Sequence, residues 1–304
     1  ASGGRGGTAA QGIDRYPRVI GVQQGAAPGP TLICTASVHG NEPAGFEALA
    51  RVLQILQTRR PPLRGEFTGL IGNRTALAQS RRYVDRDLNR LWIPQLVQAL
   101  TAGQELHHAA AEHAEITELL GEVQAAIGRA RGITYVLDLH TTSGDSPPFA
   151  TISDTLRNRA FALQFGIPIV LGLEEHLDGT FLGYMEGLAD VTVGFEGGGH
   201  QHPLSVDNLA ACVWVALAAC GLLTTPSDVP EVGHARARLR EASGGVPPVL
   251  EVRHRHAVVP GEAFQMNPGF ASFQPVLKGQ LLGYDRSGPI QAPDRKSTRL
   301  NSSH

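Results

Sequence analysis

Short apolar segments alternate with helix-patterned segments along the first two thirds of the chain, and this alternation most limits what the chain can fold into. The segment 31–38, "TLICTASV", is continuous in apolar and small residues, which is typical of a strand buried on both faces. In 42–57 apolar residues recur at helical spacing, and Pro43 suits a first helical turn. Further strands are expected at 17–25, 65–73, 133–140, 168–173 and 190–199, and further helices within 91–130 and at 156–166 and 206–222. This order predicts an α/β fold with a mostly parallel central sheet flanked by helices.

The pattern changes after an arginine-rich helical segment at 231–242. Short alternating runs are then separated by Pro-Gly, Asn-Pro-Gly, Lys-Gly and Ser-Gly turns, which indicates a small β-rich C-terminal domain. The last residues are polar and unpatterned, and they hold Lys296, one of only two lysines among 26 basic residues. We therefore expect a flexible N-terminus (1–16), a large α/β domain (17–225), a linker or helix (226–246), a truncated β-rich domain (247–293) and a non-native tail (294–304).

Charge and composition exclude several classes of protein. The formal net charge is −2, which indicates no basic surface for nucleic acid, and 42% of the residues are hydrophobic, enough for a full core. No apolar segment reaches the roughly 20 residues that a membrane helix needs. The three cysteines, Cys34, Cys212 and Cys220, lie in apolar segments, which predicts free thiols in a reducing compartment. With no secretory signal in view, we expect a cytoplasmic protein that binds neither nucleic acid nor membrane, in an oligomeric state that stays open.

Two histidines and two glutamates stand at the ends of predicted strands. His39 and Glu42 come directly after one strand, in the turn that opens the following helix. His140 ends a second strand, and Glu196 lies near the end of a third. Each alone has an ordinary explanation, such as a cap, a buried polar pair or a turn. Because open α/β sheets bind ligands beyond the carboxyl ends of their strands, we expect the four side chains to line one rim.

These residues match the requirements of a metal site. Two histidines and one carboxylate are a ligand set of catalytic zinc, with a fourth position left for water. His39 and Glu42 are three apart across a turn, so both can face one ion, and His140 completes the set. We therefore expect one Zn²⁺ per chain at these three residues. Water activated by zinc needs a group that takes its proton, and Glu196 is the candidate.

The segment 80–90, "SRRYVDRDLNR", is dense in charge. It holds four arginines and two aspartates around a short apolar pair. Such a run is usually a solvated loop whose charges pair with one another. It is also a suitable anion-binding loop, because arginine binds carboxylates through two parallel hydrogen bonds. The pattern alone leaves both interpretations open.

Four motifs together carry a resemblance to a known family. "HGNEPAG", "RRYVDRDLNR", "VLDLHTTSG" and "FEGGG", in this order, resemble the succinylglutamate desuccinylase/aspartoacylase family of the zinc carboxypeptidase-like clan. The resemblance covers roughly residues 18 to 293 and is far more specific as a set than in any one piece. It implies a zinc-dependent hydrolase that uses activated water to cleave the amide bond of an N-acyl amino acid or a similar small carboxylate substrate. The domain at 17–225 would then be catalytic.

The resemblance also implies a role for each residue of these motifs. The zinc ligands would be His39, Glu42 and His140. Glu196 would be the general acid and base, and Arg82 would polarise the scissile carbonyl and stabilise the oxyanion. Asn89 and Arg90 would hold the carboxylate of the substrate. Asp138 would orient a zinc ligand.

The chain departs from the family pattern at one functional position. The aspartoacylase branch places a further arginine shortly before the catalytic glutamate, where it holds a second carboxylate of the substrate. No arginine or lysine occurs here between Arg159 and Arg236. This counts against N-acetylaspartate and against any substrate that needs a second basic anchor from that region.

Two alternatives to a deacylase use the same residues. One is a zinc carboxypeptidase that acts on the C-termini of peptides. The other is a non-catalytic module that binds zinc or an amino acid, although such a module has no need of Glu196. The absence of a Gly-x-Ser-x-Gly segment disfavours a serine hydrolase.

The remaining histidines give weaker indications. A polar helical segment holds His107, His108 and His113 together with Glu105, Glu112 and Glu115, and its composition predicts a surface helix. His200 and His202 follow Glu196 closely, so a contact with substrate is one interpretation. His254 and His256 share one face of a predicted strand, without a third ligand nearby in the sequence.

Overall fold

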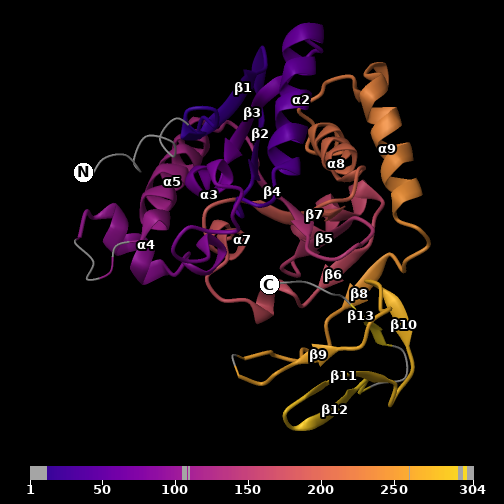
Figure 1. Ribbon diagram of the computed structural model, residues 1–304. Helices are drawn as coiled ribbons and strands as arrows, with labels where there is room; N and C mark the ends of the chain where they lie inside the picture. The colour runs from indigo at the N-terminus through magenta and orange to yellow at the C-terminus, as the bar shows by residue number, and fades with distance from the viewer. Residues whose placement is uncertain (1–11, 105–107, 109, 260, 294–296, 300–304) are drawn as a thin grey trace.

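The computed structural model describes residues 12–104, 108, 110–259, 261–293 and 297–299, and an eight-stranded sheet forms its centre (Figure 1). The strand order is β1-β3-β2-β4-β7-β5-β6-β8. Five of the seven pairings are parallel, and β1–β3 and β5–β7 are antiparallel, so the predicted mostly parallel sheet is confirmed. The strands are β1 (Val19–Gln24), β2 (Ala27–Ala36), β3 (Arg64–Ile71), β4 (Thr134–Thr142), β5 (Phe149–Ile152), β6 (Ile169–Leu171), β7 (Val191–Gly199) and β8 (Val249–Glu251).

Helices cover both faces of this sheet (Figure 1). Strand β2 has buried side chains on both of its faces. Leu32 and Cys34 are buried with residues of α2 and α8, while Ile33, which lies between them, is buried with residues of α5. One face carries α2 (Ala44–Arg59), α6 (Leu156–Ala162), η2 (Leu163–Phe165), α8 (Ser205–Ala219) and α9 (Pro230–Ala242), and the short turn η4 (Pro226–Asp228) leads into α9. The other carries η1 (Leu88–Arg90), α4 (Pro94–Thr101), α5 (Ala111–Arg129) and α7 (Phe181–Met185), with α3 (Arg74–Ala78) in contact with α5, and η3 (Glu174–His176) follows β6.

Several elements differ from the sequence expectation. The arginine-rich helix expected at 231–242 is present as α9, but it is not only a surface connection, because it packs along α8 and buries Val232, Ala235 and Leu239. Strand β8 extends the central sheet beside β6, although the sequence pattern assigned it to the C-terminal β region. Strand β5 and helices α3 and α7 were not expected, because segments of four or five residues are too short to show a period.

A small antiparallel β region follows, as expected (Figure 1). It consists of a sheet of β9 (Gln265–Met266), β11 (Leu281–Asp285) and β12 (Gly288–Gln291), and of a pair formed by β10 (Gln274–Val276) and β13 (Ser297–Arg299). It contacts the central domain where the ring of Phe273 packs edge-on against Phe149, with centroids 5.2 Å apart. Of the expected tail, residues 294–296 and 300–304 lie outside the described residues, whereas 297–299 form β13.

The described part of the expected flexible N-terminus contacts the domain. Residues 1–11 lie outside the described residues, but the ring of Tyr16 packs edge-on against Phe46 at 5.3 Å. The three cysteines are buried and form no disulfide, as expected. Among the helices that the structure describes, none combines the length and apolar character needed to cross a bilayer.

Candidate metal and catalytic site

The turn after β2 positions the first two predicted ligands. Its backbone is tight: Ser37 has a positive φ of 55°, and the amide of Glu42 donates to the carbonyl of His39 at 3.1 Å. A Cβ at Gly40 would lie 2.1 Å from the carbonyl carbon of Ala76, so only glycine lets this turn pack against α3. His39 and Glu42 are therefore held side by side at the carboxyl end of a parallel strand.

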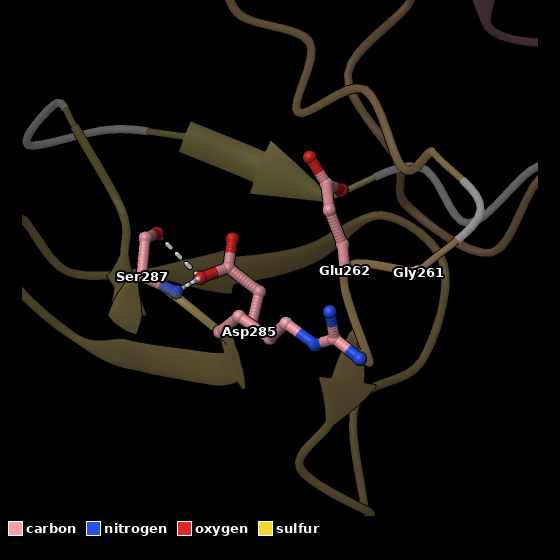
Figure 2. Close-up of a pocket in the computed structure, with 5 residues that line it drawn as sticks. Gly261, Glu262, Asp285 and Ser287 are labelled. Carbon is pink, nitrogen blue, oxygen red and sulfur yellow. Dashed lines mark hydrogen bonds between the residues drawn. The ribbon is translucent and has the colours of Figure 1, made fainter.

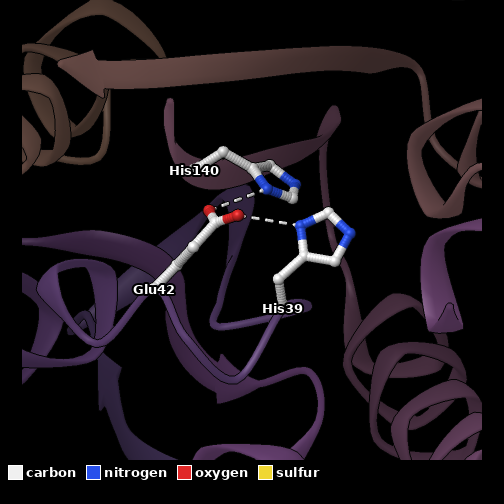
Figure 3. Close-up of side chains that lie close together, drawn as sticks. All are labelled: His39, Glu42 and His140. Atoms are coloured by element: carbon white, nitrogen blue, oxygen red, sulfur yellow. Dashed lines mark hydrogen bonds and ion pairs between the residues drawn. The ribbon is translucent and has the colours of Figure 1, made fainter. Parts of the chain in front are cut away.

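His39, Glu42 and His140 converge in the folded chain (Figure 3). Oε1 of Glu42 lies 2.9 Å from Nδ1 of His39, and its Oε2 lies 3.2 Å from Nδ1 of His140. One ligand atom from each residue lies within 4.8 Å of the others, and all three side chains are buried. The sequence separation of 98 residues between Glu42 and His140 is bridged because β2 and β4 are adjacent strands.

A second carboxylate contacts the far nitrogen of each imidazole. Nε2 of His39 lies 3.1 Å from Oδ1 of Asp87, and Nε2 of His140 lies 2.7 Å from Oδ2 of Asp138. The other oxygen of Asp138 accepts from Thr35 Oγ1 at 2.5 Å. When each Nε2 carries the proton and donates to its aspartate, both Nδ1 lone pairs face Glu42.

The charges around the two rings fit a bound cation. Burial opposes charge on His39 and on His140, yet neighbouring carboxylates outweigh it and raise the pKa of both imidazoles above the ordinary value. Burial likewise opposes ionisation of Glu42, but His140 and His39 hold the pKa of Glu42 well below its usual range. Glu42, Asp87 and Asp138 thus bring three carboxylates around two imidazoles, and a divalent cation at Nδ1 would compensate that charge.

Asp87, to which the sequence pattern assigned no role, joins the arginine-rich loop to this cluster. Its Oδ2 accepts from Nε and Nη2 of Arg82 at 3.1 and 3.0 Å. Burial opposes charge on Asp87, yet His39 and Arg82 hold its pKa well below the usual range. The loop is thus partly self-paired, as one interpretation of its composition expected, but the pair contacts His39. No local pattern could reveal this contact, because Asp87 and His39 are 48 residues apart.

Asn89 and Arg90 lie in η1, at the end of the same loop. Oδ1 of Asn89 accepts from the backbone amide of Phe181 at 2.8 Å, which fixes the orientation of its amide group. Nη1 of Arg90 donates to the carbonyl of Asn89 at 2.6 Å, and burial lowers the pKa of Arg90. Asn89 lines a pocket beside the metal cluster, together with His140 and Glu196.

Glu196 lies on β7 directly opposite His140 on β4 and is 4% exposed. Its place in the pocket lined by His140 and Asn89 puts a carboxylate next to the candidate ligands and to the arginine-rich loop. Thr151 on β5 and Glu174 in η3 also line this pocket, and Thr151 Oγ1 donates to Glu174 Oε1 at 2.8 Å.

The other histidines contribute less. His200 contacts Thr141 Oγ1 at 2.7 Å, and the amide of Thr141 donates to Glu42, so Thr141 connects His200 to the cluster. His254 and His256 do not lie on a strand, since β8 ends at Glu251. His256 faces Asp285 at 3.5 Å, beside a separate pocket lined by Gly261, Glu262, Asp285, Arg286 and Ser287 (Figure 2). None of the predicted site residues lines that pocket.

The segment around residues 105–115, which the sequence predicts to be a surface helix, differs from that expectation. Glu105 and His107 lie outside the described residues, and His108 is exposed. Glu112 and Glu115, however, are 0% and 4% exposed and point into the protein from the first turns of α5. The polar composition of the segment hid these buried carboxylates, because their partners come from 26 to 97 residues away.

An open, mostly parallel sheet with a buried His–Glu–His cluster beyond its strand ends defines an α/β protein with a candidate metal site. The family described as "Succinylglutamate desuccinylase/Aspartoacylase catalytic domain" matches residues 28–216, more than half of the chain, and the chain belongs to this family.

Curated relatives match a shorter region. The succinylglutamate desuccinylase of Burkholderia pseudomallei (strain 1710b) is 33% identical over 111 residues, which are 36% of this chain and 30% of that protein. The succinylglutamate desuccinylase of Photorhabdus laumondii is 28% identical over 137 residues, 44% of this chain and 40% of that protein. The matched region thus spans about a third of the length of these relatives.

Solved structures agree over nearly the whole chain. Succinylglutamate desuccinylase from Vibrio cholerae has a TM-score of 0.65 at 15% identity and covers 97% of this chain and 89% of its own. The ectoine utilization protein EutE (DoeB) from Ruegeria pomeroyi gives 0.59 at 19% identity, with 92% and 81% covered. Murine aminoacylase 3 gives 0.56 at 18% identity, with 91% of each chain covered. At these identities the likeness shows a shared fold.

Proposed function

We propose that the chain is a zinc-dependent deacylase that hydrolyses the amide bond of an N-acyl amino acid or a similar small carboxylate substrate. The observation that carries the proposal is the meeting of His39, Glu42 and His140 beside a pocket that also contains Glu196 and Asn89. Relatives in the same family, and structures of the same fold, are named desuccinylase and aminoacylase, which supports removal of an acyl group.

His39 and His140 would bind zinc through Nδ1, and Glu42 through a carboxylate oxygen. Bound there, zinc would polarise the scissile carbonyl and lower the pKa of a water molecule to about 7. Asp87 and Asp138 fix the tautomer of the two imidazoles by accepting from Nε2, so that each ring presents its lone pair at Nδ1.

The remaining steps belong to side chains of the pocket and the loop. Glu196 takes a proton from the attacking water and returns it to the leaving nitrogen, as a general base and then a general acid. Arg82, held by Asp87, pairs with the negative charge that develops on the carbonyl oxygen. Nδ2 of Asn89 and the guanidinium of Arg90 donate hydrogen bonds to the carboxylate of the substrate.

The test is hydrolysis of a panel of N-acetyl and N-succinyl amino acids by zinc-loaded and chelated protein, with short peptides measured beside them. We expect zinc-dependent release of the free amino acid, and faster turnover of the N-acyl amino acids than of the peptides. Faster release of C-terminal residues from peptides would identify a carboxypeptidase instead. Tight binding of zinc with no turnover of any substrate would favour a binding module and overturn the proposal.

A further inference from the structure

The carboxylate of Glu112 accepts hydrogen bonds from the backbone of the arginine-rich loop, residues 80–90. Its side chain is fully buried in the first turn of α5. Oε1 accepts from the amide of Val84 at 2.6 Å, and Oε2 accepts from the amides of Asp85 and Arg86 at 3.2 and 3.1 Å. Three consecutive backbone donors thus converge on one carboxylate, and the beginning of a helix is a favourable place for that charge.

The same carboxylate is connected to the turn that carries the metal ligands. Nδ2 of Asn73 donates to Oε1 of Glu112 at 3.3 Å, while Oδ1 of Asn73 caps α3 by accepting from Ala76 at 3.0 Å. Gly40, in the turn of His39, packs against the backbone of Ala76. The amide of Gly40 also donates to the carbonyl of Arg82 at 3.1 Å. Contacts therefore link the carboxylate to the loop directly and to the His39 turn through α3.

We propose that Glu112 is a positioning residue for the site. By fixing the backbone at 84–86, it sets where the loop presents Arg82 and Asp87 to His39, and Asn89 to the pocket. The consequence for catalysis rests on the proposed function, but the positioning of the loop does not.

A carboxylate is required at this position for a physical reason. The three amides of the loop need acceptors, and a carboxylate supplies two oxygens with only acceptor capacity. Glutamine has nearly the same shape but replaces one oxygen with a donor, so the amides that face this group lose their acceptor. If Glu112 only filled space beneath the loop, the isosteric amide would serve as well.

Glu115 provides a matched control. It is buried one turn further along α5 and accepts from Arg18, from the amides of Arg74 and Thr75, and from Thr75 Oγ1. It makes none of these bonds with residues 80–90. Glu115→Gln therefore removes a second buried carboxylate from the same helix, one that is paired with Arg18 and not with the arginine-rich loop.

The first experiment is hydrogen–deuterium exchange of the metal-free chain, which needs no turnover. We expect Glu112→Gln to accelerate exchange of the amides of 84–86 at least about tenfold, with the amides of β2 and β4 unchanged. Glu115→Gln should accelerate exchange at 74–75 and leave 84–86 as in the unmutated chain. Unchanged protection of 84–86 in Glu112→Gln would overturn the proposal, whether or not the chain is a deacylase.

The second experiment is kinetic, at saturating zinc. Glu112→Gln should lower kcat/KM about 10- to 100-fold, and Glu115→Gln less than about threefold. In the double variant Arg82→Ala/Glu112→Gln, the second change should add little to the loss of kcat, because Glu112 acts through the position of Arg82. Equal losses in Glu112→Gln and Glu115→Gln, or full additivity with Arg82→Ala, would show that Glu112 affects only general stability.

Discussion

Asp87 lies with one carboxylate oxygen 3.1 Å from Nε2 of His39 and with the other in contact with both Nε and Nη2 of Arg82. One side chain therefore orients a proposed zinc ligand and also holds the proposed oxyanion donor. Asp138 makes the corresponding contact with His140, at 2.7 Å, but its other oxygen binds Thr35 rather than an arginine. The two aspartates thus share one task and differ in a second.

This difference gives the first prediction. Asp87→Asn and Asp138→Asn should each weaken zinc binding about 10- to 100-fold, because each loses a charged partner of a ligand imidazole. At saturating zinc, kcat should return to the unmutated value in Asp138→Asn but stay reduced in Asp87→Asn, because Asp87→Asn also weakens the ion pair that positions Arg82. Zinc affinity is measured by competition with a chelator, and kcat with one N-acyl amino acid. Equal kcat values for both variants at saturating zinc would show that Asp87 does not act on catalysis through Arg82.

Zinc content tests the ligand set itself. We expect about one zinc per chain in the unmutated protein and none in His39→Ala or His140→Ala, because removal of one of three protein ligands empties an open site. His256→Ala is the matched control, since His256 lies outside the cluster, and it should retain zinc. Metal analysis and circular dichroism of the same samples separate loss of zinc from loss of fold. Full zinc retention in both ligand variants contradicts the assignment.

Glu196→Gln should affect rate and not metal. The amide keeps the shape of the side chain and removes its basicity, and positioned acid–base groups contribute roughly 10²- to 10⁴-fold. We expect kcat to fall within that range while zinc content and KM change little. Near-normal turnover of the zinc-loaded variant would mean that another group moves the proton.

The fold could be predicted because central strands carry runs of apolar and small residues, as β2 does in its second half. The candidate metal ligands and the candidate acid–base group could be located because His39 and Glu42 follow β2, while His140 and Glu196 lie near the ends of β4 and β7. Helix α9 could have been placed in the core from Val232, Ala235 and Leu239, which recur at i, i+3 and i+7 beneath the arginines. The domain boundaries, the individual residue roles and the cytoplasmic location remain predictions.

Asp87 and Glu112 could not be predicted, for a physical reason. The role of each comes from contacts with residues brought together by the sheet and by α5, and no local period marks such contacts. In sequence, Asp87 is one charge among six in its loop, and Glu112 is one of several acidic residues in a polar helix. Buried carboxylates of this kind are recognised only when their donors are known.

The buried pair of Glu115 and Arg18 gives a prediction for pH. Burial opposes ionisation of Glu115, but Arg18 and Thr75 outweigh it and lower the pKa of this carboxyl below its ordinary value of about 4.3. A carboxyl whose folded pKa is lowered stabilises the fold fully above the unfolded value and loses this contribution as pH falls below it. The difference in thermal unfolding midpoint between the unmutated chain and Glu115→Gln should therefore be largest near pH 6–7 and shrink below about pH 4. A difference that stays constant from pH 7 to pH 3 contradicts this assignment.

The arginine-rich loop gives the most informative test of the proposed reaction, because Arg82 and Arg90 have different tasks. Arg82 meets charge that appears only as the carbonyl becomes tetrahedral, so Arg82→Ala should lower kcat about 10²- to 10³-fold at saturating zinc. Arg90 meets a carboxylate that is already present in the bound substrate, so Arg90→Ala should act largely through KM. Because the planar guanidinium makes two parallel hydrogen bonds, Arg90→Lys should restore only part of the loss.

The control is the substrate itself. Hydrolysis of one N-acyl amino acid is compared with hydrolysis of its α-amide by the unmutated chain and by Arg90→Ala. If Arg90 and Asn89 hold the carboxylate, the unmutated chain prefers the free acid strongly, and Arg90→Ala loses most of that preference while its kcat changes little. A self-paired surface loop predicts instead that neither arginine variant changes either constant by more than a few-fold. If the unmutated chain hydrolyses the amide as well as the free acid, no carboxylate is bound there, and the role given to Asn89 and Arg90 is wrong.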